Sequence, residues 1–512
     1  MNVEVQTRQG IVRGARGDRV VSFKGIPFAA APIGDLRFAP PAEPPSWHGV
    51  RDATRYGAIS LQHLDGLAAT IPGCEWAFYH PGAVQDEDCL NLNIWVPDMA
   101  SDTPRAIFVW IHGGSFLAGS GTALWYDGAN LAAREDIIVV TVNYRLGALG
   151  ALSVDPEGTA GNNFLRDQIA ALTWIRDNIG VFGGDPAKVT IGGESAGAMS
   201  VVALMCIPEA RGLFRAGIVQ SGHGSLNTTK EQALDVAVQY IADLGAPETN
   251  SLTALRALDT QTLLDAQERL TGKVMLPCRP VVDGEFLPAT PLEIFRAGKQ
   301  AQIPLLTGTN ADENSLFTLV MGDVDARGGL PGVLSELFEG ADPVVIEELA
   351  RMYGALATND ADALTTLTTD RDWRGPLDAL CDAHADSGSP VFVYEFTYRT
   401  PVLDGALGAC HALDIPFPFG NLATRGVSEF AGDDKELRPV REATQDAFMR
   451  SWGSFIRTGE PSGPDLPSWP AYRSDQRTMM RIGTDGGLVV DPYRERLDRL
   501  SELMSTAEVF KF

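Results

Sequence analysis

The chain has 512 residues, and a hydrophobic content of 45% is enough to bury a large core, which excludes a disordered protein. The 66 acidic and 41 basic residues give a formal net charge of −25, which repels nucleic acid and anionic lipid. We therefore expect no nucleic-acid partner.

Sequence features also indicate the cellular setting. Residues 1–10, MNVEVQTRQG, lack the basic and apolar regions of a secretory signal, and no run reaches the roughly 18 apolar residues that cross a bilayer. The six cysteines lack the paired short spacing of a zinc site. We expect a cytoplasmic monomer or small homo-oligomer with buried thiols, no membrane anchor, and no metal or organic cofactor.

In the N-terminal segment apolar and polar residues alternate, and glycines stand at the expected turns. Residues 3–28 therefore predict two or three antiparallel edge strands. A proline-rich irregular stretch over 27–45 and a loop-like region up to residue 88 follow.

From residue 90 onward the pattern indicates buried strands, because short apolar runs rich in β-branched and aromatic residues are typical of strands covered on both faces. These runs are 90–97, 105–114, 136–145, 188–195, 215–222, 304–310 and 390–398. Between the third and fourth runs, a helical stripe repeats in steps of four, three, three and four residues. Its members are Leu165, Ile169, Leu172, Ile175 and Ile179.

Strand, helix and strand in this order predict an α/β fold with a large, mostly parallel sheet covered by helices on both faces. The stretches near 227–298 and 316–386 are mostly helical and have few strand-like runs. We interpret them as cap or side helices inserted between sheet strands, and we expect residues 1–512 to form a single domain.

A candidate nucleophile lies in Gly193-Glu194-Ser195-Ala196-Gly197, which matches the pattern G-x-S-x-G. The motif stands between a predicted strand and a predicted helix of small residues. A strained turn at such a junction presents a serine hydroxyl at the edge of the sheet.

A serine nucleophile needs a base, and the chain order typical of α/β-hydrolases is nucleophile, acid, histidine. Only His384 and His411 lie well beyond Ser195. His411 follows the strand at 390–398, whereas His384 lies in a preceding helix, where we expect it at the surface. Because catalytic groups emerge from the carboxyl ends of strands, His411 is favoured. The same rule leaves either Asp312 or Glu313 as the acid.

The strand at 105–111 ends in His112-Gly113-Gly114-Ser115. Glycines let a backbone approach a substrate closely, and backbone N–H groups at such a turn can hold the oxygen of a tetrahedral intermediate. We therefore expect part of an oxyanion hole at this turn.

Several ordered blocks now resemble the type-B carboxylesterase and cholinesterase family over nearly the whole chain. They are GIPFAAAPIGDLRF, EDCLNLNIWVP, WIHGGSFLAGS, VTVNYRLGALG, DQIAALTWIRDNIGVFGGDPAKVTIGGESAGAMS and IVQSG. The resemblance implies an α/β-hydrolase fold and a carboxylic ester hydrolase with a small ester substrate.

The resemblance also assigns residues. Gly308 to Glu313 match the family's G-x-x-x-D-E motif, which implies that Glu313 is the acid. The implied oxyanion donors are Gly114, Ser115 and Ala196, although many relatives have glycine where Ser115 stands. Ser221 resembles the serine that hydrogen-bonds the acid, and Glu194 is expected beside the pocket.

Further positions follow from the same likeness. Two buried ion pairs are implied, Arg37 with Glu87 and Arg145 with Asp167. Cys74 and Cys89 stand where relatives close a loop with a disulfide, although a reducing compartment favours free thiols. By approximate alignment the acyl pocket is lined near Val274 and Leu276, positions that are aromatic in acetylcholine-specific relatives, which suggests more room here. Tyr79 stands near the place of the tryptophan that binds choline in those relatives.

These residues predict acyl transfer through an acyl-enzyme on Ser195, with His411 as the base and a broad range of uncharged apolar esters as substrates. Activity is then expected to fall as the pH drops through about 6 to 7, near the unperturbed histidine pKa. The alternatives are an aryl-carbamate or amide hydrolase with the same triad and a non-catalytic, cholinesterase-like binding protein.

Overall fold

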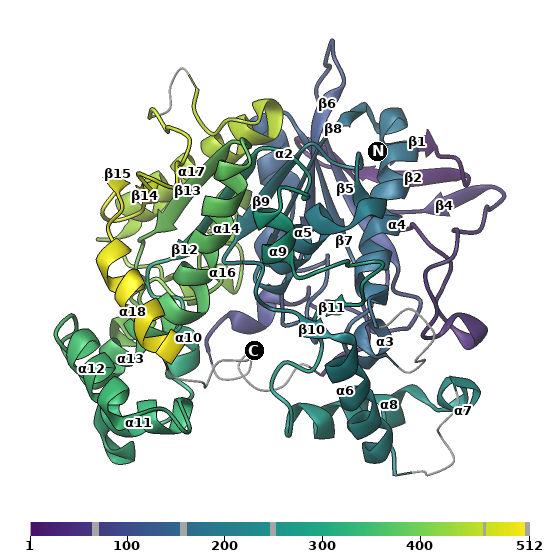
Figure 1. The fold of residues 1–512 in the computed structure, drawn as a ribbon. Coiled ribbons are helices and arrows are strands. Elements are labelled where there is room, and N and C mark those ends of the chain that lie inside the picture. The colour runs from purple at the N-terminus through teal and green to yellow at the C-terminus, as the bar shows by residue number, and fades with distance from the viewer. Residues whose placement is uncertain (1, 64–70, 154–160, 246–251, 464–466, 507–512) are drawn as a thin grey trace.

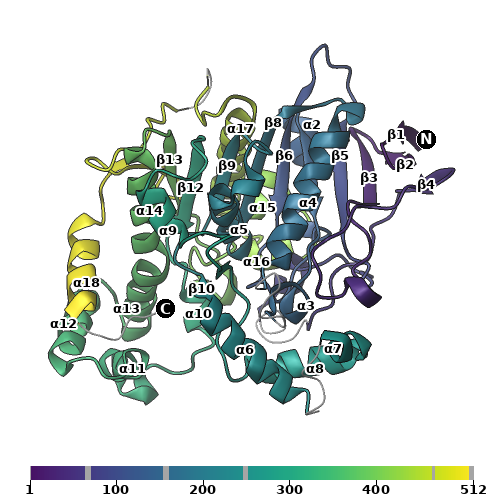
Figure 2. The same cartoon turned by 45° about the vertical axis from the view of Figure 1, so that its right-hand side comes forward.

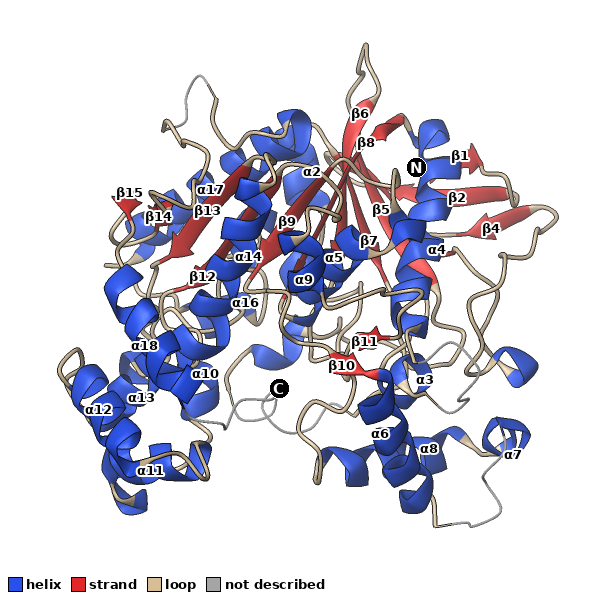
Figure 3. Cartoon of the chain, in the orientation of Figure 1, coloured by secondary structure: helices blue, strands red, loops and turns tan. Residues whose placement is uncertain are grey.

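The computed structural model describes residues 2–63, 71–153, 161–245, 252–463 and 467–506. In this part of the chain one large sheet runs through the molecule between layers of helices (Figure 3). Its order is β1-β2-β3-β5-β7-β6-β8-β9-β12-β13-β14-β15, and β4 pairs with β2 at one end. The strands are β1 (Asn2–Gln6), β2 (Ile11–Arg16), β3 (Val20–Pro27), β4 (Val50–Asp52), β5 (Asn91–Pro97), β6 (Arg105–Ile111), β7 (Ile138–Val142), β8 (Gly184–Glu194), β9 (Ala216–Gln220), β12 (Leu305–Asn310), β13 (Val391–Phe396), β14 (Thr478–Ile482) and β15 (Gly487–Val490).

The centre of this sheet is parallel, and its ends are antiparallel except for the parallel pair of β2 with β4. From β7 through β6, β8, β9, β12 and β13 to β14, every neighbouring pair is parallel. The expected antiparallel strands at the N-terminus are confirmed as β1, β2 and β3, and the antiparallel pairing continues through β5 to β7. The sequence therefore predicted the fold class correctly.

Helices cover both faces because the central strands are apolar on both sides. In β6, Ile107, Val109 and Ile111 pack into one core cluster, whereas Phe108 and Trp110 pack into another. Figure 2 shows the first face covered by α4, α5, α9 and α14, with α17 behind the sheet. The helices of these layers are α2 (Ala129–Glu135), α4 (Asn163–Asn178), α5 (Ala196–Cys206), α9 (Pro291–Arg296), α14 (Gly375–Asp386) and α17 (Arg438–Thr458).

Both predicted insertions are largely helical. Figures 1 and 2 show α6–α8 and α11–α13 as two groups beyond the same edge of the sheet, and each group packs around a separate small core cluster. A short parallel pair, β10 (Thr228–Thr229) with β11 (Val281–Val282), accompanies the first group. The remaining helices are α3 (Gly147–Ala151), α6 (Lys230–Asp243), α7 (Leu252–Ala257), α8 (Thr260–Thr271), α10 (Ser315–Thr318), α11 (Gly329–Leu337), α12 (Pro343–Gly354), α13 (Asp360–Thr369), α15 (Pro416–Phe419), α16 (Val427–Ala431) and α18 (Arg494–Thr506).

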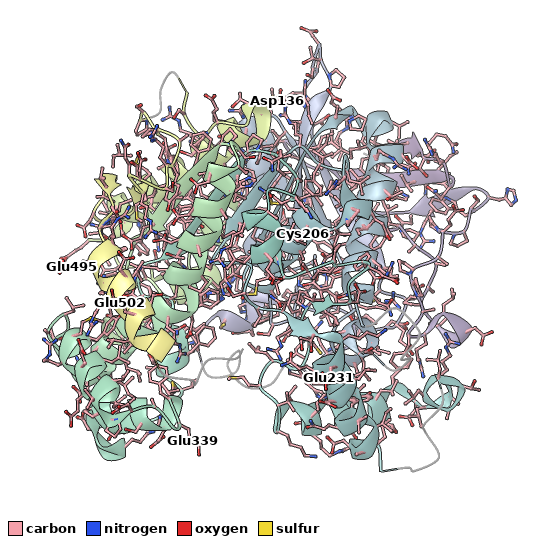
Figure 4. The ribbon with its side chains drawn as sticks, viewed as in Figure 1. Asp136, Cys206, Glu231, Glu339, Glu495 and Glu502 are labelled. Carbon is pink, nitrogen blue, oxygen red and sulfur yellow. The ribbon has the colours of Figure 1, made fainter. Side chains whose placement is uncertain are left out.

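The excess negative charge lies on the outside of the fold. In Figure 4 the labelled carboxylates on outer helices and loops, such as Glu231, Glu339 and Glu495, are exposed, whereas the labelled Cys206 is buried. None of the helices described here is both long enough and apolar enough to cross a membrane.

Candidate active site

Four neighbouring parallel strands end side by side, and each continues into a loop that carries a candidate residue. The register pairs Ile111 of β6 with Gly193 of β8, and Glu194 of β8 with Gln220 of β9. Gln220 is also paired with Gly308 of β12. Because parallel strands bring their carboxyl ends to one edge of the sheet, the residues that follow them meet there.

Ser195 occupies the sharp turn between β8 and α5, as its motif predicts. Its backbone has φ 54° and ψ −123°, a sparsely populated conformation that costs on the order of 1–3 kcal/mol. Backbone hydrogen bonds hold the turn, from Ser195 N to Gln220 O at 3.0 Å and from Met199 N to Ser195 O at 2.9 Å. This geometry is that of a nucleophile elbow, which exposes the hydroxyl at the end of the strand.

Two glycines make this turn possible. A Cβ on Gly197 would lie 2.0 Å from Ile111 O, and a Cβ on Gly193 would lie 2.5 Å from the carbonyl carbon of Gly197. Any side chain at either position would therefore force backbone atoms apart. The two glycines of the motif are needed because α5 packs directly against the end of β6.

The loop after β6 presents its backbone to the site. Gly114, Ser115 and Phe116 have φ values of 107°, 58° and 60°, and a Cβ on Gly114 would lie 2.1 Å from Ala118 O. Among the described residues, the N–H groups of Gly114, Ser115 and Ala196 have no hydrogen-bond partner. Gly114 and Ser115 line the cavity described below, whereas Ala196 is buried behind Ser195. Three unpaired N–H donors at this edge can stabilise a negatively charged oxygen.

Glu313 is fully buried in the loop after β12, and its carboxylate accepts hydrogen bonds from three directions. Ser221 Oγ and Asn310 N donate to Oε1 at 2.5 and 2.7 Å, and His411 Nδ1 lies 2.6 Å from Oε2. Asp312, the alternative that the residues left open, forms an ion pair with an exposed arginine instead. The carboxylate brought to His411 is therefore that of Glu313.

His411 lies in the loop after β13, with its ring between two carboxylates. Its Nε2 is 3.1 Å from Glu194 Oε1, on the side opposite to Glu313. Ser195 and His411 line the same cavity, but no hydrogen bond between these two described side chains is formed. Catalytic hydrogen bonds are often long in unliganded sites and tighten only when substrate binds.

The two carboxylates change the acid–base behaviour of the site. Burial lowers the pKa of His411, but the charges of Glu194 and Glu313 outweigh it and raise this pKa from 6.5 to about 9. Burial also raises the pKa of Glu194 to about 8. We expected activity to fall as the pH drops through about 6 to 7, near the unperturbed histidine pKa. The raised pKa of His411 moves this fall in activity to higher pH.

The alternative base, His384, lies in α14 as expected but is fully buried and not at the helix surface. Its Nε2 lies 2.9 Å from Ile303 O, and its Nδ1 lies 2.9 Å from Gln300 Nε2. The ring also packs against Phe295, with 5.2 Å between ring centroids. α14 is sandwiched between α9 and the sheet, so His384 is a polar core residue whose hydrogen bonds are satisfied.

The sequence did not predict a tryptophan that contacts both His411 and the loop that carries Glu313. Trp373, in the wide helical turn Asp370–Arg374, packs on the His411 ring with 4.5 Å between centroids. Its Nε1 donates to Asn314 Oδ1 at 2.7 Å, and the Asn314 side chain also donates to Asp372 at 2.8 Å. Trp373 lies far along the chain from both partners and belongs to no motif, so the sequence gives no signal for this role.

A cavity of about 460 Å³ opens at Ser195 and His411. Its wall is mainly apolar and aromatic, with contributions from the loop after β6, α8, α10 and the loop after β13. The apolar side chains that line it are Ala77, Phe78, Leu117, Ala118, Trp125, Tyr126, Leu316, Phe317, Ala412, Ile415 and Phe430.

The three pocket residues suggested by approximate alignment do not line this cavity. Tyr79 is half-buried next to the lining residue Phe78, and Val274 packs against the core of α6 and α8. Leu276 lies in the loop after α8 with a φ of 52°. The wall near this loop comes from residues of α8 itself, such as Gln267, because the helix and not the loop faces the site.

Both predicted ion pairs are confirmed. Arg37 Nε donates to Glu87 Oε2 at 2.7 Å, and the Arg145 guanidinium binds both oxygens of Asp167 at 2.7 and 2.8 Å. Arg145 also donates to Ala39 O at 2.7 Å. The Arg37–Glu87 pair and the bond from Arg145 to Ala39 O tie the irregular segment before β4 to the sheet edge that carries the site, while the Arg145–Asp167 pair joins the loop after β7 to α4.

All six cysteines are free and buried. Cys74 and Cys89 therefore do not form the bridge that some relatives have at this place. Burial raises the pKa of both thiols to about 12, so thiolates are scarce. No group of three or more His, Cys, Asp or Glu in the described part of the chain is arranged to hold a metal ion.

Comparison with known proteins agrees with this geometry. The model of the carboxylesterase family matches residues 1–499. Para-nitrobenzyl esterase of Bacillus subtilis is 36% identical over 503 residues, covering 97% of this chain and 98% of that protein. Acylcarnitine hydrolase of Mus musculus is 35% identical over 477 residues, covering 90% and 83%. A crystal structure of a Geobacillus stearothermophilus carboxylesterase superposes with a TM-score of 0.85 at 38% identity, covering 97% of this chain and 99% of that one. The chain therefore belongs to the carboxylesterase family, has the α/β-hydrolase fold, and is a serine carboxylic ester hydrolase.

Proposed function

We propose that Ser195, His411 and Glu313 form the catalytic triad of this esterase, with Gly114, Ser115 and Ala196 as oxyanion donors. The observation that carries the proposal is the short contact of Glu313 with His411 Nδ1, 2.6 Å, on the wall of the cavity that also contains the strained Ser195. Glu313 fixes the tautomer in which Nε2 is free to take a proton.

In this mechanism His411 Nε2 takes the proton of Ser195 as its oxygen attacks the ester carbonyl. The developing oxyanion receives hydrogen bonds from the three unpaired N–H groups. His411 then gives its proton to the departing alcohol. The same imidazole next activates a water molecule, which hydrolyses the acyl-enzyme and releases the carboxylic acid and the free serine.

His411 must leave Glu194 to reach Ser195 in this sequence. At 3.1 Å the Glu194 carboxylate favours the charged imidazolium in the resting site, so His411 must first lose that proton to act as a base. The same carboxylate stabilises the charge again once the neutral imidazole has taken the serine proton. Ser221 holds Glu313 from the other side through its 2.5 Å bond. We assign both residues a supporting role.

The substrates we propose are uncharged, apolar esters of broad structure. The mainly apolar wall and the volume of about 460 Å³ favour them, and the acidic surface disfavours polyanions. Comparing p-nitrophenyl esters with a matched phenylcarbamate tests this preference. Faster turnover of the carbamate would instead assign a carbamate hydrolase.

We further propose that residues 1–512 act as a single catalytic domain, as a monomer or small homo-oligomer in the cytoplasm. The six free thiols support a reducing compartment. Cell fractionation and light scattering test these two points.

The triad is tested by Ser195→Ala, with the exposed Ser335→Ala of α11 as the matched control. We expect the first variant to lose at least about 1000-fold in kcat on p-nitrophenyl butyrate and the second to match the wild type. A folded Ser195→Ala protein that turns over at the wild-type rate would overturn the proposal. Mass spectrometry after reaction with a phosphonate ester locates the modified residue independently.

A further inference from the structure

One wall of the cavity is formed by the inserted helix α8. Gln267, Glu268 and Thr271 of this helix line the cavity. An adjoining face of the helix anchors it, because Leu263, Ala266 and Leu270 are buried in the core cluster shared with α3 and α6. The cavity face of α8 is therefore held in a fixed position.

Gln267 differs from its two neighbours on this wall, because it is only 6% exposed whereas Glu268 and Thr271 are exposed. One end of its carboxamide is fixed: Ala148 N donates to Oε1 at 2.8 Å. Gly147, with a φ of 55°, makes room for this end, since a Cβ there would lie 1.8 Å from Oε1. Because a backbone N–H can only donate, the bonded atom is the oxygen and the other atom is the NH₂ group.

That NH₂ group has no hydrogen-bond partner among the residues the structure describes. It belongs to a buried side chain on the cavity wall and stands close to the oxyanion loop, since Gly147 N donates to Phe116 O at 2.7 Å. This nitrogen retains solvent-accessible surface although its residue is largely buried, so in the free enzyme water can satisfy it. A bound molecule with an acceptor oxygen can replace that water, whereas a bound methylene at the same place would leave the donor without a partner.

We infer that Gln267 is a specificity-determining residue, which selects esters that carry a second, neutral acceptor oxygen a few atoms from the scissile carbonyl. An ether, a ketone or a second ester carbonyl fits this description. A carboxylate does not, because Glu194 and Glu268 line the same cavity in a protein of net charge −25. The inference rests on the proposed esterase function and deepens it.

The test compares p-nitrophenyl alkanoates with analogues in which one methylene is replaced by an ether oxygen at successive positions. A second series places the ether in the alcohol part of alkyl hexanoates. Each analogue is measured against its methylene isostere by kcat/KM in the wild type and in Gln267→Glu. The variant keeps an acceptor for Ala148 N but replaces the donor by a second acceptor. For each pair of esters, the ether-to-methylene ratio of kcat/KM in the wild type is divided by the same ratio in the variant. This division cancels the intrinsic reactivity of each ester.

We expect the wild type to prefer the ether over the methylene at one or two positions, by about three- to tenfold more than Gln267→Glu does. Gln261→Glu, on the same helix but exposed, is the control and should retain the wild-type ratios. Equal ratios in wild type and Gln267→Glu throughout both series would overturn the inference. If the wild type hydrolysed none of these esters, the proposed esterase function itself would be refuted. Failure of the inference and failure of the proposed function are therefore distinguishable.

Discussion

The two sides of the candidate site are held together by different means. On the serine side the backbone fixes the geometry, through the strained Ser195 turn and glycines packed against carbonyl groups. On the histidine side, the side chains of Glu313, Glu194 and Trp373 surround His411 and fix its position. The backbone geometry of the serine side is encoded by a short stretch of sequence. The side-chain contacts of the histidine side come from segments that are far apart in the chain. Substitutions on the two sides should therefore fail in different ways.

The largest effect is expected on the side-chain side. Glu313→Gln removes the charge that stabilises the imidazolium and offers His411 an amide in place of a carboxylate, so kcat should fall by about 10²–10⁴ with little change in KM. Asp312→Asn is the matched control next to it and should lose far less. Stopped-flow or steady-state hydrolysis of p-nitrophenyl butyrate measures both. Equal losses would mean that the loop, and not the Glu313 charge, matters.

On the backbone side, Gly197→Ala forces a Cβ to within 2.0 Å of Ile111 O. The elbow and the N–H of Ala196 must move, so kcat should fall by about 100- to 1000-fold, comparable to the loss of an oxyanion donor. The thermal midpoint should fall as well. Gly180→Ala is the control, because a Cβ at Gly180 meets no atom within 4 Å. A Gly197→Ala protein with normal activity would show that this packing does not set the elbow.

The pH profile sharpens the comparison further. Since His411 acts as a base only when neutral, and its pKa is raised to about 9, kcat/KM of the wild type should fall as the pH drops below this value. Glu194→Gln removes one of the three carboxylate charges that raise the pKa of His411, the others being Glu313 and Asp414, and should move the acid limb to lower pH. The rate should change roughly tenfold per pH unit on that limb. Glu268→Gln, whose carboxyl is exposed, should leave the limb in place. An unmoved limb in Glu194→Gln would exclude this charge as the cause.

The smallest effect is expected for Trp373→Phe. The aromatic contact with His411 is kept, but the bond to Asn314 is lost, which should cost about 1 kcal/mol of stability and reduce kcat a few-fold. Trp47→Phe loses a comparable indole bond, to Ile11 O at 2.9 Å, far from the site. It should show the stability loss with unchanged kcat. Identical behaviour of the two variants would reduce Trp373 to a packing residue.

The same contrast explains what the sequence predicted. The elbow at Ser195, the turn at Gly114 and the parallel centre of the sheet follow from short patterns of glycine and apolar residues. His411 followed from the rule that catalytic groups emerge from strand ends, but the choice of Glu313 over Asp312 needed the family resemblance. The structure adds the reason, since only Glu313 is buried with its carboxylate turned to the imidazole.

The cavity wall was predicted less well because it is built by inserted helices. Val274 and Leu276 were assigned by alignment in a loop, whereas the neighbouring helix α8 faces the site through Gln267. Phe317 lies only four residues after Glu313, but its apolar character is equally typical of a core residue. Which side of a short helix turns inward depends on tertiary packing that periodicity alone does not encode.

The six buried thiols give this enzyme a built-in reporter. With a pKa of about 12 for Cys74, Cys89 and Cys278, a thiol reagent finds almost no reactive sulfur while the fold is closed. For the thiols outside the cavity, alkylation then requires opening of the fold, so its rate measures how often each layer opens, whereas Cys74 lines the cavity. Because the cysteines are spread over the sheet's two faces, the order in which they are alkylated would map the sequence of unfolding events without any engineered label.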